Sequence, residues 1–252
     1  MSQAIARIVE NPFPVKLTPV MVGAFKALAP YITEEPLRSL VRDVEGNADA
    51  IARICAQRRE LFPFVTTTIA PTVIRGSSAA CNVMPQDMSA VVNFRIAEGE
   101  TVEELLSHVR AAIGDETVSL RFLQANDPSA TARTDGYGYA RLTEAMGRYF
   151  QDVVFVPSLT AGATDAHHYE IICDTCLRCS PFMASPEDVA RGVHGTDERI
   201  SLRSYSQGIR VLIHLMDTAA IHPSMTLSKS SGASAPGAFF STGKDFVPTG
   251  TA

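Results

Sequence analysis

The stretch Asp87-Met88-Ser89-Ala90-Val91-Val92-Asn93-Phe94-Arg95-Ile96 has an apolar residue at every second position, with Ser89, Val91, Asn93 and Arg95 between them. Successive side chains of a β-strand point to opposite faces of a sheet, so this alternation predicts a strand with one buried face. The apolar face consists of Met88, Ala90, Val92, Phe94 and Ile96. The other face carries Asn93 and Arg95, so it offers polar side chains to a ligand or to solvent.

The residues on either side of this strand predict most of a ferredoxin-like unit. Before it, the β-branched run at 65–74 predicts strands, with Pro71 at an edge or a bulge. After it, 101–113 predicts a helix and 117–123 predicts another strand, while a further helix is predicted from the first residues of the chain. This order is that of a β-α-β-β-α-β unit without its first strand, which we expect upstream of Met1. An unpaired strand edge is expected where that strand is missing.

The second half of the chain predicts an α/β arrangement, because helical and strand-like patterns alternate there. A buried strand is expected at 153–156 and another strand at 175–182. A long helix is expected after its N-cap Ser201. Its expected buried face holds Leu202, Tyr205, Ile209, Leu212, Ile213 and Met216. The segment 219–252, rich in Ser, Gly, Ala and Thr, predicts a disordered tail.

Charge and composition exclude several classes of protein. The net charge of −5 argues against a nucleic-acid partner. We expect no membrane partner, because no apolar run is long enough to span a bilayer. The first residues lack the basic and apolar parts of a secretory signal. An odd number of cysteines, with Cys55 and Cys81 far from the others, argues against a disulfide framework. We therefore expect a cytoplasmic protein.

Cys173, Cys176 and Cys179 are spaced as C-x-x-C-x-x-C, a spacing that iron–sulfur and zinc sites use. A cluster needs a fourth ligand and a loop that wraps the metal. The apolar neighbours of these cysteines instead predict a helix end and a strand, on which Cys176 and Cys179 would point to opposite faces. We therefore interpret the three cysteines as small buried hydrophobic residues, with a metal site as the alternative.

Three other places hold side chains suited to an anion or a metal. His194 lies between glycines in the loop 192–200, directly before the last predicted helix. Thr164 lies in a strand-to-helix turn whose backbone N–H groups suit a carboxylate. Arg95 and Asn82 can together hold a carboxylate, the arginine with a two-pronged contact. The simpler alternatives are a polar loop, a helix cap and an exposed arginine.

Four motifs resemble, in order, those of one enzyme family. Asn82-Val83-Met84-Pro85 followed by Asn93-Phe94-Arg95-Ile96 resembles the paired lid-domain signature of the M20 metallopeptidases. Gly162-Ala163-Thr164-Asp165-Ala166-His167-His168-Tyr169 resembles the Gly-Gly-Thr-Asp turn of that family. Ser180-Pro181-Phe182, Pro186-Glu187-Asp188 and Val193-His194-Gly195-Thr196-Asp197-Glu198-Arg199-Ile200 resemble the C-terminal signature of its carboxypeptidase S-like branch. The resemblance covers about residues 1–218.

The resemblance implies a hydrolase with two zinc ions that cleaves amide or peptide bonds next to a free carboxylate, in N-acyl amino acids or dipeptides. It implies that His194 is a terminal ligand of one zinc. It implies that Asn82 and Arg95 hold the substrate carboxylate or stabilise charge on the scissile carbonyl, and that Gly162 and Thr164 line the substrate pocket. It also implies a homodimer formed through the lid.

The resemblance also divides the chain into an incomplete lid and dimerisation domain at 1–125, the C-terminal portion of an α/β catalytic domain at 126–218, and the tail at 219–252. The general base and the other zinc ligands of the family belong to an N-terminal half that has no counterpart here. A catalytic zinc takes about three protein ligands, and His194 supplies one. We therefore expect the isolated chain to be inactive. The alternative is a non-catalytic remnant that serves as a dimerisation or ligand-binding module.

Overall fold

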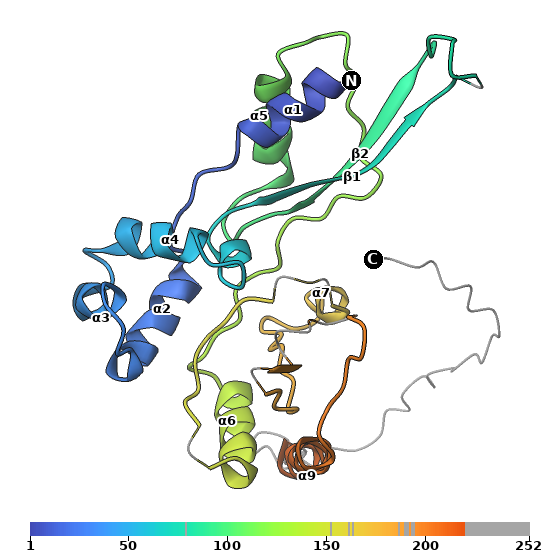
Figure 1. Ribbon diagram of the computed structural model, residues 1–252. Helices are drawn as coiled ribbons and strands as arrows, with labels where there is room; N and C mark the ends of the chain where they lie inside the picture. Colours follow the sequence, from blue (N-terminus) through green and yellow to red (C-terminus); the bar gives the residue numbers. More distant parts are fainter. Residues whose placement is uncertain are drawn as a thin grey trace, which may run out of the picture.

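The computed structural model describes residues 1–78, 80–151, 153–160, 162, 164–185, 187–188, 192 and 195–219, so the predicted tail lies outside the described residues except for Ala219. Helices and strands follow one another along the chain from blue to red in Figure 1. The α-helices are α1 (Ser2–Glu10), α2 (Pro19–Leu28), α3 (Leu37–Leu40), α4 (Ala48–Ala56), α5 (Val102–Ile113), α6 (Tyr137–Tyr149), α7 (Ala166–Tyr169) and α9 (Leu202–Ala219). The strands are β1 (Thr68–Gly76) and β2 (Met88–Arg95), and short 3-10 helices span Ala29–Tyr31, Val41–Asp43 and Phe62–Phe64.

Helices α1 and α5 lie side by side against the root of the β-hairpin (Figure 1). Their apolar stripes meet in one cluster, against which Phe94 of β2 and Ile96, just after that strand, also pack. Helix α5 begins with a capping box, in which the Thr101 hydroxyl accepts from the backbone N–H of Glu104 and the Glu104 carboxylate accepts from that of Thr101. The helices predicted at the start of the chain and at 101–113 are confirmed.

Helices α2, α3 and α4 form a separate packed unit on one side of the molecule (Figure 1). Ile51, Cys55 and Val65 are completely buried in its core. The hydroxyl of Thr18 accepts a hydrogen bond from the backbone N–H of Met21 and so caps α2. Each fully buried aliphatic side chain in such a core contributes about 1.5–3 kcal/mol relative to its exposed state.

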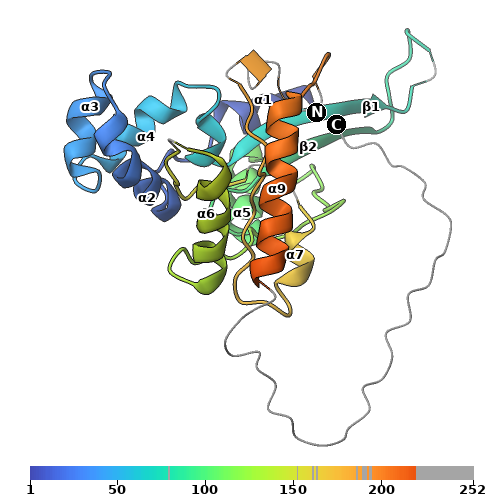
Figure 2. The same cartoon turned by 90° about the horizontal axis from the view of Figure 1, so that it is seen from below.

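Strands β1 and β2 form a two-stranded antiparallel hairpin whose register shifts between Pro71 and Val73, which confirms the predicted irregularity. The hairpin extends beyond the helices (Figures 1 and 2), so its outer residues are exposed, including Met88 of the predicted buried face. Because the sheet has two strands, each keeps an unpaired edge within the described part of the chain.

The predicted strand at 117–123 is wrong: this segment has no regular structure, although Val118 and Leu120 pack against the α1–α5 cluster. A ferredoxin-like unit consists of two βαβ halves whose strands form one sheet. In this sheet the last strand of the unit pairs with its first strand. The described residues contain no such first strand. The backbone of 117–123 therefore has no neighbouring ladder to join.

The second region is organised around α6 and α9, which pack side by side (Figures 1 and 2). The strands predicted at 153–156 and 175–182 are wrong, because these segments have no regular structure. A buried parallel strand needs hydrogen-bonded neighbours on its edges, and the described residues of this region supply none. The predicted α/β alternation of 126–218 is thus limited to its helices in the described part.

The predicted buried face of α9 is also wrong. Its six apolar residues, from Leu202 to Met216, are all exposed, whereas Ser204, Gly208 and Val211 are buried. The small residues let the helix approach its neighbours closely, and a methyl group at Gly208 would overlap the ring of Phe182. The predicted start of α9 is confirmed, since the Ser201 hydroxyl accepts from the backbone N–H of Ser204. No helix among the described residues is both long and apolar enough to cross a bilayer.

Candidate functional site

A polar cavity of about 560 Å³ lies where the two regions of the chain meet. Its wall includes the end of β2, the connection at 124–134, one face of α6 and the segments on both sides of α7. Three residues that the sequence analysis selects, Arg95, Gly162 and Thr164, line this cavity together. The volume lies within the range of about 300–1,000 Å³ that is usual for small-molecule sites.

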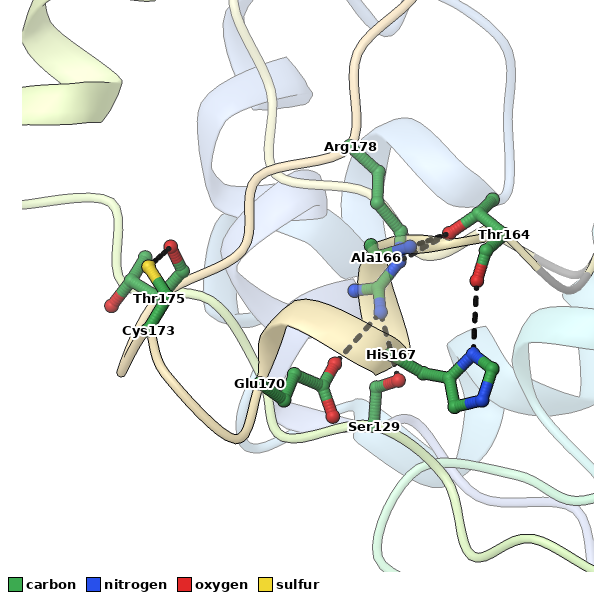
Figure 3. A network of polar contacts seen from close by, with 8 residues as sticks. All are labelled: Ser129, Thr164, Ala166, His167, Glu170, Cys173, Thr175 and Arg178. Atoms are coloured by element: carbon green, nitrogen blue, oxygen red, sulfur yellow. Dashed lines mark hydrogen bonds and ion pairs between the residues drawn. The ribbon is translucent and has the colours of Figure 1, made fainter. Parts of the chain in front are cut away.

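Arg178 is the centre of the polar network beside this cavity (Figure 3). Its Nε donates to the hydroxyl oxygen of Thr164 at 3.1 Å, and its Nη2 donates to Ser129 Oγ at 2.8 Å and to Glu170 Oε1 at 2.9 Å. The Arg178 side chain is 23% exposed and that of Glu170 is 26% exposed. An ion pair that is mostly shielded from water is screened less by salt than a surface pair. The network therefore fixes the guanidinium while leaving its Nη1 without a hydrogen bond to any described residue.

The turn before α7 positions Thr164 for this contact. Thr164 Oγ1 accepts from the backbone N–H of Ala166 at 3.4 Å, and its carbonyl oxygen lies 3.2 Å from Nδ1 of His167 (Figure 3). These local contacts hold the hydroxyl toward Arg178 rather than toward solvent. Gly162 precedes this turn, and a side chain there would meet no atom within 4 Å. A larger residue at position 162 would therefore reduce the open space of the cavity rather than strain the fold.

The cavity has charged groups of both signs: Arg95 and Arg178 line it together with the acids Glu98 and Asp127, and Glu170 lies beside it. Hydrogen bonds from Ser129 and Arg178, together with the positive charge of Arg178, hold the pKa of Glu170 below its ordinary value of 4.5. Of the two acids in the wall, Glu98 accepts from Thr131 Oγ1 at 2.5 Å, and Asp127 accepts from the backbone N–H of Val102 at 2.8 Å. All three carboxylates thus accept hydrogen bonds from protein donors, and Arg95 and Arg178 line the same cavity. Two arginines in one cavity are suited to an anion, and a carboxylate is the planar partner that arginine binds best.

Of the other two predicted site residues, the structure describes Asn82 and not His194. Asn82 is exposed in the β1–β2 connection and does not line the cavity, and Figure 1 shows that the hairpin tip points away from α6 and α7. His194 lies outside the described residues. The assignments of Asn82 to the substrate carboxylate and of His194 to zinc both stay predictions.

The described donors do not fit a zinc site on their own. Among the described residues, no three side chains of His, Cys, Asp or Glu come together as a metal-binding group. A catalytic zinc takes about three protein ligands, so this part of the chain cannot supply the full set. The rings of His167 and His168 lie against each other, with centroids 3.7 Å apart and an interplanar angle of 42°, and no third ligand among the described residues joins them.

The interpretation of the three cysteines as buried residues is wrong for two of them. Cys173 and Cys179 are exposed and Cys176 is half-buried. Burial raises the pKa of the Cys176 thiol, and the neighbouring Cys173 raises it further. The segment 173–179 does not form the predicted strand, which explains why its side chains do not alternate between a buried and an exposed face.

Sequence reasoning missed Arg178, the residue with the most polar contacts at the site. It lies between Leu177 and Cys179, where the cysteine spacing drew attention to the wrong side chains. An arginine flanked by partly apolar residues, fourteen positions after Thr164, gives no periodic signal that would connect the two. Its partners Ser129, Thr164 and Glu170 are separated along the chain and meet only in the fold.

Comparisons with known proteins agree on one family. Residues 1–120 match the peptidase dimerisation domain of M20 peptidases. The chain is similar to a probable carboxypeptidase S-like 2 of Dictyostelium discoideum, with 26% identity over 220 residues, which are 86% of this chain and 41% of the relative. It is also similar to the mouse N-fatty-acyl-amino acid synthase/hydrolase PM20D1, with 27% identity over 225 residues, 87% of this chain and 44% of the relative.

A third relative is the succinyl-diaminopimelate desuccinylase of Burkholderia vietnamiensis, with 26% identity over 180 residues, 69% of this chain and 42% of the relative. The chain thus spans less than half the length of each of these relatives. No solved structure matches the chain significantly. The chain therefore belongs to the M20 peptidase family, and its residues 1–120 correspond to the dimerisation domain of that family.

Proposed function

We propose that this chain is part of a hydrolase that cleaves amide or peptide bonds next to a free carboxylate, with N-acyl amino acids or dipeptides as substrates. The observation that carries this proposal is the joint position of Arg95, Thr164 and Arg178 in one cavity. Carboxypeptidase-like and N-acyl-amino-acid names among the relatives support it. Hydrogen bonds to a charged partner contribute about 1.5–3 kcal/mol each, enough for strong selection of a carboxylate over a neutral amide.

In this proposal the residues of the cavity bind and orient the substrate. Arg95 and the Nη1 group of Arg178 donate to the two carboxylate oxygens, while the contacts of Arg178 with Ser129 and Glu170 hold its guanidinium in place. Apolar wall residues such as Leu142 and Phe155 exclude water from the remainder of the substrate. Gly162, which lines the cavity, remains proposed as a substrate contact. Asn82 does not line it, and its contact with the substrate remains an expectation from the family resemblance.

Zinc remains the proposed cofactor, with His194 as a proposed ligand. Two zinc ions would ionise a water and polarise the scissile carbonyl in the complete family enzyme. Because the described residues do not supply a full ligand set, we expect no turnover by this chain alone. Release of alanine from N-acetyl-L-alanine by the zinc-supplemented chain would contradict this expectation.

A second candidate function is a dimerisation or ligand-binding module without catalysis. The match of residues 1–120 to a dimerisation domain favours it, as does the absence of a metal-binding group among the described residues. We propose a homodimer through this domain for either function. Sedimentation velocity across a range of concentrations tests the dimer, and a monomer at every concentration would contradict it.

The binding proposal is tested by titration calorimetry on the full chain with N-acetyl-L-alanine and its neutral analogue N-acetyl-L-alaninamide. We expect the acid to bind at least roughly tenfold more tightly than the amide. Arg178→Gln should remove most of this preference. Arg133→Gln is the matched control, because Arg133 pairs with Asp135 at the surface and does not line the cavity. Equal affinities for acid and amide in the unmodified chain would contradict the proposal.

A further inference from the structure

Glu170 and Arg178 close a loop in the second region of the chain. They lie eight residues apart, yet Glu170 Oε1 accepts from Arg178 Nη2 at 2.9 Å, and both side chains are mostly shielded from water. Arg178 is fixed further by its hydrogen bond to Thr164. In Figure 3 the stretch that carries Cys173 and Thr175 projects to the side, away from this ion pair. The ends of the loop 170–178 are therefore held together by contacts that do not involve its cysteines.

Cys173 and Cys176 lie in this loop, and two observations place their thiols near each other. Cys173 Sγ donates to the carbonyl oxygen of Thr175 at 3.1 Å, so its side chain turns back toward the peptide bond that leads into Cys176 (Figure 3). Burial raises the pKa of the Cys176 thiol, and the charge and hydrogen bond of Cys173 raise it further. The second effect requires that the two side chains interact.

Cys179 does not take part in this interaction. Burial raises the pKa of its thiol, and no thiol among the described residues contributes to that shift. The described residues also contain no group of three side chains suited to a metal ion. Two interacting thiols without further ligands are suited to oxidation to a disulfide rather than to metal binding, since a structural zinc takes four ligands.

The pair is open to a reagent in solution, because Cys173 is exposed and Cys176 is half-buried. We propose that Cys173 and Cys176 are a site of reversible oxidation, at which a low-molecular-weight disulfide such as oxidised glutathione converts the two thiols into one intramolecular disulfide, and that the ion pair of Glu170 with Arg178 keeps the two thiols together. The C-x-x-C spacing is one that redox-active cysteine pairs use. The inference does not depend on the proposed function, because neither thiol binds the substrate in that proposal.

The reaction consists of two thiol–disulfide exchanges. The thiolate of the exposed Cys173 attacks one sulfur of oxidised glutathione, so a mixed disulfide forms and one glutathione thiolate leaves. The thiolate of Cys176 then attacks Cys173 Sγ, which forms the intramolecular bond and releases the second glutathione thiolate. The protons lost by the two cysteines pass through solvent to the two glutathione thiolates. Two electrons thus pass from the chain to the oxidant, and an excess of reduced glutathione reverses both steps.

The test is equilibration of the full chain, without oxygen, in mixtures of reduced and oxidised glutathione, followed by alkylation of free thiols and tryptic digestion. Trypsin cleaves after arginine, so Cys173 and Cys176 remain in one peptide, 149–178, whereas Cys179 begins the next peptide, 179–191. The expected product is the peptide 149–178 without alkylation and lighter by two hydrogen atoms than its reduced form. A main product that joins the two peptides would show pairing with Cys179 and overturn the inference.

The same data give an effective concentration, which measures how far the fold brings the two thiols together. It is the ratio of oxidised to reduced peptide 149–178, multiplied by the squared concentration of reduced glutathione and divided by the concentration of oxidised glutathione. We expect the folded chain to have a value roughly tenfold above that of the same chain unfolded in urea, where the loop is flexible. Equal values would overturn the inference, because the fold would then add nothing to the proximity of the thiols.

Variants connect this proximity to the loop. Glu170→Ala removes the carboxylate that closes the loop and should lower the effective concentration roughly fivefold. Glu144→Ala is the matched control, because Glu144 pairs with Arg141 within α6, and it should leave the value unchanged, as should Cys179→Ser. An unchanged value in Glu170→Ala, or loss of the disulfide in Cys179→Ser, would overturn the inference. Circular dichroism checks that each variant is folded.

Discussion

Residues 1–120 and residues 126–219 of this chain differ in how they are held together. The first region has two packed clusters, one of α2–α4 and one of α1, α5 and the hairpin root. Among the described residues after 120, the buried hydrophobic residues are Ala145, Met146, Phe150 and Val211. Most of the apolar surface of α9 is instead exposed.

The first region therefore serves mainly as a scaffold, whereas the second supplies most of the polar residues of the site. The well-packed region carries the dimerisation domain and supplies Arg95 from the end of β2. The thinly packed region supplies Thr164 and Arg178, which are held by polar contacts rather than by a large core. A region whose ordering depends on few buried contacts opens at low free energy, as binding segments commonly do. The two regions should therefore respond differently to mutation, pH and ligand.

The largest effect is expected from Ile51→Ala, which leaves a cavity in the α2–α4 core. Removing a fully buried Ile side chain to alanine costs about 2–5 kcal/mol of unfolding free energy. Urea unfolding followed by circular dichroism measures this loss. Ile74→Ala is the control, because Ile74 is 60% exposed in β1 and its removal should change stability by less than about 0.5 kcal/mol. Equal losses for both variants would contradict the assignment of the core.

A smaller effect, with opposite signs at two glycines, is expected in the second region. Gly208→Ala forces a methyl group into the ring of Phe182 and should cost about 1–3 kcal/mol. Gly147→Ala places its methyl 3.8 Å from Phe155 within helix α6, and should stabilise that helix by about 0.5–1 kcal/mol. The two variants are compared by urea unfolding. If Gly208→Ala is neutral, α9 does not pack as closely as the structure has it.

The smallest effect concerns acid. The pKa of Glu170 is lowered in the folded chain, so its contacts with Ser129 and Arg178 stabilise the folded state above its ordinary pKa of 4.5. This contribution is lost as the pH falls through the lowered value. When the pH is lowered from 6 to 3, the urea midpoint of the second region should decrease more in the unmodified chain than in Glu170→Gln. The variant lacks the titrating group. An identical fall in the variant would show that Glu170 is not stabilised by this network.

The elements that the sequence predicts correctly are those set by local chemistry. Helix α5 has its capping box at Thr101 and its terminal Gly114, and the strand β2 has its alternation. These signals lie within a few residues of each other, so no distant contact is needed to interpret them. The hairpin irregularity at Pro71 follows from the missing N–H of proline.

The predictions that are wrong depend on partners elsewhere in space. A strand at 117–123, 153–156 or 175–182 requires a neighbouring strand, and an alternating or apolar pattern does not reveal whether one is present. The apolar stripe of α9 is real in the sequence, but its buried residues are Ser204, Gly208 and Val211. Gly208 lies against Phe182, and Val211 packs with Ala145 and Met146 of α6. A hydrophobic stripe indicates which face of a helix is suited to burial. It does not show which face packs against neighbouring residues in this chain.

At the site, three of the five predicted residues share a cavity, and the central arginine was missed. Local chemistry already indicates Arg95 and Thr164, and the motif resemblance adds Gly162 and the expectation that all three belong to one site. Arg178 belongs to no such motif, and its role follows only from the hydrogen bonds to Ser129, Thr164 and Glu170.

The central claim is that one carboxylate is held by both regions at once, and the Arg95→Gln variant tests it most directly. The measurement is the ratio of the dissociation constants of N-acetyl-L-alaninamide and N-acetyl-L-alanine, determined by calorimetry for Arg95→Gln, for the unmodified chain and for the control Arg75→Gln. Arg75 lies on the same hairpin but does not line the cavity. We predict that Arg95→Gln lowers the ratio by roughly tenfold while Arg75→Gln leaves it unchanged. An unchanged ratio in Arg95→Gln would contradict the claim.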